Sequence, residues 1–68
     1  MTYSPGFHVG LQAAADWHRE QARLMRLIVE DGPSRVGAEA VKRAGWAASH
    51  HDACAALILN IRPTREAA

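Results

Sequence analysis

Two long segments of the chain repeat their hydrophobic residues every three or four positions, as one face of an amphipathic helix requires. In the first segment, residues 5–30, one side of the helix would carry Ala14, Trp17, Gln21, Leu24, Met25 and Ile28. The opposite side would carry Asp16, Arg19, Glu20, Arg23, Arg26 and Glu30. Opposite charges three or four positions apart are typical of a solvated helix surface. The segment therefore predicts a helix with one buried and one solvated side.

The second segment, residues 34–61, carries a broader hydrophobic arc. Its central stripe consists of Val36, Ala40, Ala44, Ala47, His51, Cys54, Ile58 and Ile61. The stripe is widened on one side by Val41, Ala48, Ala55 and Leu59, and on the other by Trp46, His50 and Leu57. Because a single partner helix covers only a narrow stripe, this arc predicts contacts with more than one helix.

Turn-forming residues separate the two segments and mark their ends. Ser4 is suited to cap the first helix and Pro5 to its first position. Residues 31–34, Asp-Gly-Pro-Ser, predict a tight turn, and Pro63 would stop the second helix before a tail at 62–68. No stretch alternates hydrophobic and polar residues in the manner of a strand. We expect one helical domain over residues 1–68.

These elements predict an all-α fold, an antiparallel two-helix hairpin. A lone hairpin would leave much of both hydrophobic arcs in water, so we expect two copies to pair as a homodimeric four-helix bundle. Gly45 leaves an alternative open, because glycine inside a helix costs about 1 kcal/mol relative to alanine. A break at Gly45 would give a three-helix monomer instead.

Composition narrows the functional classes. A chain of 68 residues buries only about 60% of its unfolded surface, which makes a monomeric core marginal. The single cysteine predicts a reduced, cytoplasmic protein without disulfides. A net charge of +1 supplies no strong attraction for nucleic acid or anionic lipid, and no stretch approaches the length of a membrane span.

Polar residues within the hydrophobic arcs are the candidates for chemistry. In a hairpin centred on Gly32-Pro33, His18 and His51 would lie within about one helical turn, and Gln21 joins them in a polar core layer. The metal alternative would use His18, His50, His51 and Cys54, since His50 and Cys54 are four residues apart. Neither a Cys-x-x-Cys nor a His-x-x-x-His motif occurs, so we expect no metal and no cofactor.

Catalysis and nucleic-acid binding find less support in the sequence. Cys54 would need an oxyanion-binding group and a cleft beside its histidine neighbours, and an alanine-rich hairpin predicts neither. We therefore expect no enzymatic activity.

The stretch SRVGAEAVKRAGW resembles the second helix of a helix-turn-helix, with Arg35, Lys42 and Arg43 as contacts. Glu39 and Asp52 balance these charges, and nucleic acid is the last of our alternatives.

Protein binding is the function that the pattern favours. Trp46 lies at the flank of the second arc, where tryptophan in a small hydrophobic patch is a frequent binding anchor. We expect a non-enzymatic interaction module, a homodimer that can bind another protein around Trp46, as a small accessory protein or inhibitor would. The residues expected at its interfaces are Trp17, Gln21, Leu24, Ile28, Trp46, Leu57, Ile58 and Ile61.

Two segments of the chain also carry a family resemblance. GLQAAADWHREQARLMR followed by HHDACAALILNI resembles small uncharacterised helical proteins of alphaproteobacteria and their phages. Those proteins show an Ala-Ala-x-Trp-His-x-x-Gln-Ala segment and end in a His-x-x-Ala-Ala-x-Ile-like segment. The second segment of those proteins usually ends in Ala-Ala-Ala-Ile-Arg. This chain has Ala55-Ala56-Leu57-Ile58 instead, so the match is approximate. The resemblance implies a helical fold and an accessory protein of bacterial or phage origin, possessing no transferable activity.

Overall fold

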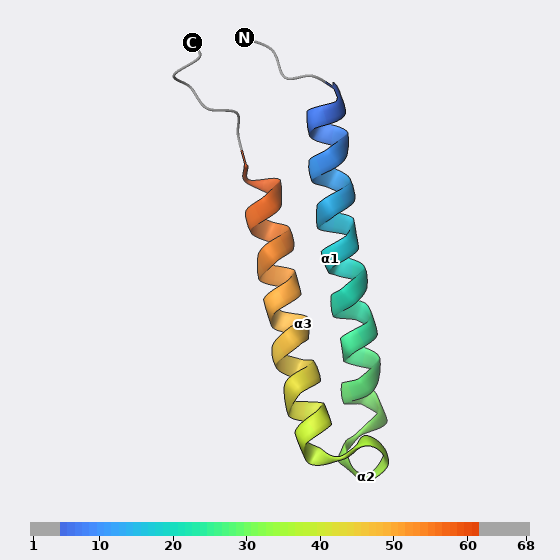
Figure 1. Ribbon diagram of the computed structural model, residues 1–68. Coiled ribbons are helices and arrows are strands. Elements are labelled where there is room, and N and C mark those ends of the chain that lie inside the picture. Colours follow the sequence, from blue (N-terminus) through green and yellow to red (C-terminus); the bar gives the residue numbers. More distant parts are fainter. Residues whose placement is uncertain (1–4, 62–68) are drawn as a thin grey trace.

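The computed structural model describes residues 5–61, which form an antiparallel helical hairpin (Figure 1). Helix α1 spans Pro5–Asp31, α2 is a short turn of helix at Pro33–Val36, and α3 spans Ala38–Leu59. The helices α1 and α3 pack side by side, and α2 lies at the end where the chain reverses (Figure 1). No strand occurs in the described residues. The predicted all-α hairpin is therefore confirmed.

The connection between the long helices differs from the predicted turn at 31–34 and helix at 34–61. Gly32 and Gly37 both have positive φ angles, 87° and 96°, so the chain is broken twice. Between them lies α2, and the Gly37 amide donates to the Pro33 carbonyl oxygen at 2.9 Å. Glycine adopts positive φ without the steric penalty of other residues. The prediction of an uninterrupted second helix from residue 34 is wrong because Gly37 acts as a second break.

The end of α3 lies close to its predicted position. The helix stops at Leu59 rather than 61, and the Asn60 side-chain amide donates to the Ala56 carbonyl oxygen at 3.0 Å. This bond satisfies one of the carbonyl groups that a helix end leaves free. The predicted cap at Ser4, the stop at Pro63 and the tail at 62–68 lie outside the described residues.

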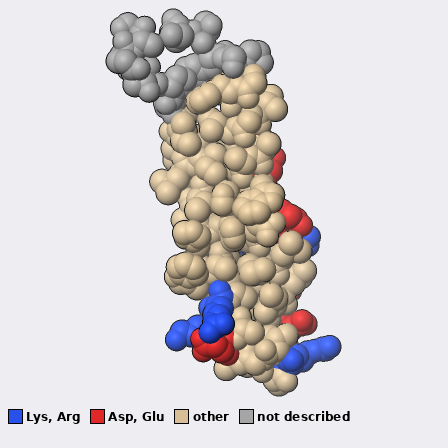
Figure 2. All heavy atoms as spheres, in the orientation of Figure 1, with Lys and Arg blue, Asp and Glu red and all other residues tan. Residues whose placement is uncertain are grey.

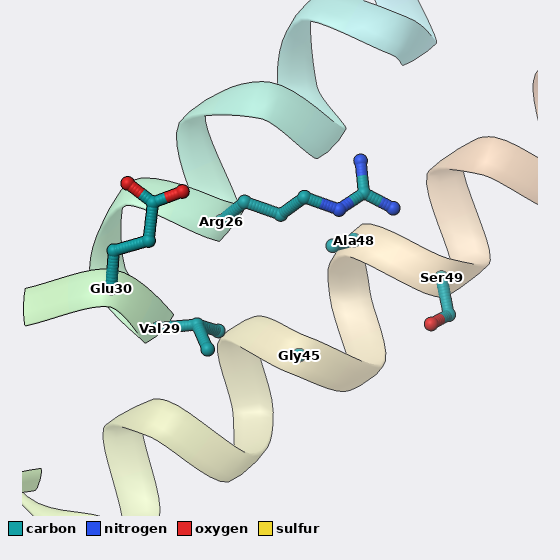
Figure 3. A pocket seen from close by; sticks show the side chains of 6 residues that line it. All are labelled: Arg26, Val29, Glu30, Gly45, Ala48 and Ser49. Carbon is teal, nitrogen blue, oxygen red and sulfur yellow. The ribbon is translucent and has the colours of Figure 1, made fainter. Parts of the chain in front are cut away.

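Gly45 does not interrupt α3. The helix continues through this position, so the three-helix alternative with a break at Gly45 is wrong. A Cβ atom at Gly45 would approach the Val29 Cγ2 atom to 3.9 Å, an ordinary contact distance. Figure 3 shows the Val29 side chain directed toward α3 at this point. The surrounding helix of 22 residues outweighs the low helix propensity of one glycine.

The two long helices meet along a seam of residues spaced alternately three and four apart. Its members are Leu11, Ala15, His18, Ala22, Met25 and Val29 of α1, and Val41, Ala44, Ala48, His51, Ala55 and Ile58 of α3. This spacing is that of antiparallel coiled-coil packing. All the buried hydrophobic residues of the described chain are alanines of the seam, with 0–4% of their surface exposed. Small side chains let the two helices approach closely, but they bury little hydrophobic surface.

Candidate functional site

A pair of histidines occupies the middle of the seam. The His18 Nδ1 atom lies 2.8 Å from the His51 Nδ1 atom, and both side chains are half-buried. At this distance one imidazole donates its N–H and the other accepts, so the two rings hold different tautomers or share a proton. The pair joins α1 to α3 by a hydrogen bond between residues 33 positions apart in the chain.

The register of the two helices differs by four residues from the one that the sequence predicted, and this difference brings His18 and His51 into direct contact. A turn centred on Gly32-Pro33 would put His18 opposite Ala47. The actual connection extends from Gly32 to Gly37, so its centre lies about two residues further along the chain. Because the helices run in opposite directions, moving the centre by two residues shifts the register by four, which places His51 opposite His18.

Trp17 covers the histidine pair on one side of the seam. Its ring lies edge-on to His18 and to His51, with centroid distances of 4.9 and 5.7 Å. Such edge-to-face arrangements are favourable for aromatic rings. Gln21, which was predicted to belong to the same polar layer, is half-buried, and within residues 5–61 no hydrogen bond joins it to either histidine.

A second polar group lies beside the first, on α3. The Cys54 Sγ and His50 Nε2 atoms are 3.7 Å apart, within the range of a weak thiol–imidazole hydrogen bond. The His50 ring stacks on Trp46 with a centroid distance of 5.2 Å and an interplanar angle of 5°. Three side chains spaced four residues apart therefore form a continuous row along one face of α3.

Trp17, His50 and Cys54 belong to a broad surface of the hairpin that we name the apolar face. It is formed by the side chains that flank the seam on the side of Trp17. Its members are Phe7, Ala14, Trp17, Gln21, Leu24 and Ile28 of α1, and Ala40, Ala47, His50, Cys54, Leu57 and Ile61 of α3. Figure 2 shows this side of the molecule, where charged atoms are confined to one edge and to the end near α2. The apolar face thus extends across both long helices.

The other side of the seam is charged. Arg26 of α1 pairs with Asp52 of α3 across it, and Figure 3 shows the Arg26 side chain extending toward α3. On α1, Arg23 donates two hydrogen bonds to Glu20, at 2.9 and 2.6 Å. The bond from Arg23 lowers the pKa of Glu20, and the same bond raises the pKa of Arg23. The Arg23 and Glu20 side chains are 60% and 49% exposed, so they mark a solvated face rather than a binding site.

The predicted interface residues fall into three groups. Trp17, Leu24, Leu57 and Ile61 are exposed on the apolar face, whereas Gln21 and Ile28 are half-buried there. Ile58 lies in the seam. Trp46 is 70% exposed at the edge of the apolar face, beside a shallow hollow formed with Glu39, Lys42, Arg43 and Ala47.

The four candidate metal ligands form two separate pairs. His18 is paired with His51, and His50 is paired with Cys54. Within residues 5–61 no group of three or more histidine, cysteine, aspartate or glutamate side chains is placed to hold a metal ion. A single copy of the described chain therefore supplies no complete tetrahedral site.

Of the three basic residues of the helix-turn-helix-like stretch, Lys42 and Arg43 share the hollow beside Trp46 with the acidic Glu39. Arg35 lies in α2, Lys42 lies in α3, and Arg43 pairs with Glu39 at 3.4 Å. A small set of charges that is partly neutralised by Glu39 gives little support to phosphate binding. None of the described helices combines the length and the apolar character that crossing a bilayer requires.

Comparisons of the chain with protein-family models, with curated proteins and with solved structures found no match.

Proposed function

We propose that the protein is a non-enzymatic interaction module whose hairpins pair through their apolar faces as a homodimeric four-helix bundle. The observation that carries this proposal is the content of the core. Among the residues that the structure describes only alanines are buried, whereas Trp17 and Leu57 on the apolar face are 56% and 69% exposed. A fold whose large hydrophobic side chains stay in water lacks the main source of folding free energy.

The shape of the hairpin supports the same proposal. Its principal extents are 55 × 19 × 9 Å, so it is a single layer of two helices. Stable domains are normally built from at least two packed layers around a core. The radius of gyration is 16.4 Å, against about 11 Å for a compact domain of this length. A second hairpin on the apolar face would supply the missing layer.

The apolar face is also large enough for a stable dimer. From its extents of 55 and 19 Å, one side of the hairpin offers roughly 1,000 Å², and standard interfaces bury about 800 Å² on each partner. The charged side, with Arg26 and Asp52, would remain in solvent. The proposed subunit is intracellular and reduced, with Cys54 kept as a thiol.

Light scattering coupled to size exclusion tests the dimer. We expect a species of twice the 7.4 kDa chain mass, and we expect Leu57→Glu to weaken the dimer at least about tenfold, because a carboxylate would be buried in the interface. Leu27→Glu is the matched control, since Leu27 is 47% exposed on α1 away from the apolar face. A well-folded monomer at high concentration would contradict the proposal.

The flank around Trp46 is a second candidate surface, for a different protein. Trp46 is held by stacking on His50 yet remains 70% exposed, which is the profile of a binding anchor. We expect Trp46→Ala to preserve the dimer but to remove a partner that co-purifies with the tagged wild-type protein. Val9→Ala, at another exposed hydrophobic residue, should retain that partner. Equal recovery of the partner with both variants would exclude the Trp46 surface.

A further inference from the structure

The hollow beside Trp46 is formed by one helix alone. Its lining residues all belong to α3, and its volume is about 470 Å³. This volume lies within the range of ligand sites, about 300–1,000 Å³. Because no described residue of α1 lines the hollow, it is closed only on the side of α3. A small molecule would keep much of its surface in water there, whereas a segment of another protein supplies the missing wall itself.

Trp46 gives the hollow an aromatic wall. One face of its indole stacks on His50, which lies one turn further along α3. The other lining residues at positions 39, 42 and 43 lie one or two turns on the opposite side of Trp46. Because the two faces of a flat ring are opposite each other, the second face of the indole is turned toward the hollow. An aromatic side chain that enters the hollow is therefore placed to stack on it.

The hollow also holds one positive charge without a counter-charge. Glu39 is paired with Arg43, the Oε1 and Nε atoms being 3.4 Å apart. Lys42 forms no ion pair within residues 5–61, and Glu39 is the only acidic residue within four positions of it. A single free cation matches one carboxylate, whereas a nucleic-acid backbone is bound by several cations.

We propose that the hollow binds an acidic segment of a partner protein. One aromatic side chain of the segment stacks on Trp46, and a neighbouring carboxylate pairs with Lys42. The two residues are four positions apart, so they lie on the same side of α3, within reach of adjacent residues of the segment. The proposal rests on the Trp46 surface proposed above and specifies the chemistry of its partner.

Two end-blocked peptides test this chemistry, Glu-Glu-Phe-Glu-Glu and Lys-Lys-Phe-Lys-Lys. Each is titrated into the isotope-labelled full-length protein, and the indole N–H signals of Trp17 and Trp46 are followed by NMR. We expect the acidic peptide to shift the Trp46 signal to saturation and to leave the Trp17 signal in place. The basic peptide should shift neither. Replacing the phenylalanine of the acidic peptide by alanine should weaken binding at least about tenfold, because the aromatic anchor is lost.

Matched variants test the role of Lys42. Lys42→Gln should weaken binding of the acidic peptide about fivefold, the upper end of the effect of an exposed ion pair. Lys42→Arg keeps the charge and should retain binding. Arg19→Gln removes the same charge from the solvated side of α1 and should also retain it. Circular dichroism on each variant verifies that the helices are retained.

Cross-linking locates the bound carboxylate directly, because Lys42 is the only lysine of the chain. A carbodiimide should join a glutamate of the acidic peptide to the Lys42 amine as an amide, the water being taken up by the carbodiimide to give a urea. Mass spectrometry should find the cross-link at Lys42 in the wild type and none at this position in Lys42→Arg. Cross-links confined to the amino terminus would contradict the proposal.

The remaining outcomes separate the acidic partner from the Trp46 surface on which it rests. Equal shifts with the two peptides, or unchanged affinity in Lys42→Gln, would overturn the acidic partner and leave the Trp46 surface standing. Phenylacetate that binds as tightly as the peptide would assign the hollow to a small anion instead. A Trp46 signal that moves only with protein concentration would assign it to a second copy of the chain. Recovery of the co-purifying partner by Trp46→Ala would overturn the surface and the acidic partner together.

Discussion

Ala48→Leu is expected to lower the free energy of unfolding by about 3 kcal/mol, the upper end of the usual effect of overpacking a core. Ala48 is 2% exposed in the seam between α1 and α3, where the helices are held close by small side chains. A leucine there must either push the helices apart, which disturbs the neighbouring His18–His51 bond, or adopt a strained rotamer. Urea unfolding followed by circular dichroism measures the change.

The matched control is Ala53→Leu in the same helix. Ala53 is exposed on the side of α3 that faces away from the seam, so the added methyl groups enter solvent. We expect a change within about 0.5 kcal/mol, as for most surface substitutions. Equal destabilisation by both variants would show that the alanines are not the packing surface of the hairpin.

The pattern of hydrophobic residues predicted the two long helices but not which of those residues are buried between them. The spacing of hydrophobic residues predicted both long helices, because a long period near 3.6 residues distinguishes a helix from a strand. It assigned Trp17 and Leu24 to the buried side of the first helix, yet both are exposed within one hairpin. The pattern identifies an arc that avoids water, but it does not say which part of the arc faces the second helix and which part is left for another chain.

The exact alignment of α1 against α3 also could not be predicted from the sequence. His18 and His51 were expected within about one turn, and they are in direct contact. Their pairing depends on the length of the connection, which Gly37 extends beyond the Asp-Gly-Pro-Ser turn. A glycine at this position is compatible either with a helix start or with a second break, and propensity alone does not separate the two. The pairing of His50 with Cys54, by contrast, follows directly from a spacing of four within one helix.

The histidine pair is expected to stabilise the hairpin through its hydrogen bond. The two Nδ1 atoms are 2.8 Å apart, and a single N–H lies between them. We expect His18→Leu to lower the free energy of unfolding by about 1–3 kcal/mol, because it leaves the His51 ring nitrogen in the seam without its partner. Urea unfolding followed by circular dichroism measures the change.

A double variant isolates the contribution of the pair. His18→Leu combined with His51→Leu removes both hydrogen-bonding partners together, so it leaves no unpaired ring nitrogen in the seam. We therefore expect the double variant to lose less stability than the single variant His18→Leu. A double variant that is less stable than the single variant would show that the 2.8 Å contact does not stabilise the hairpin, and that the two rings serve only to fill the seam.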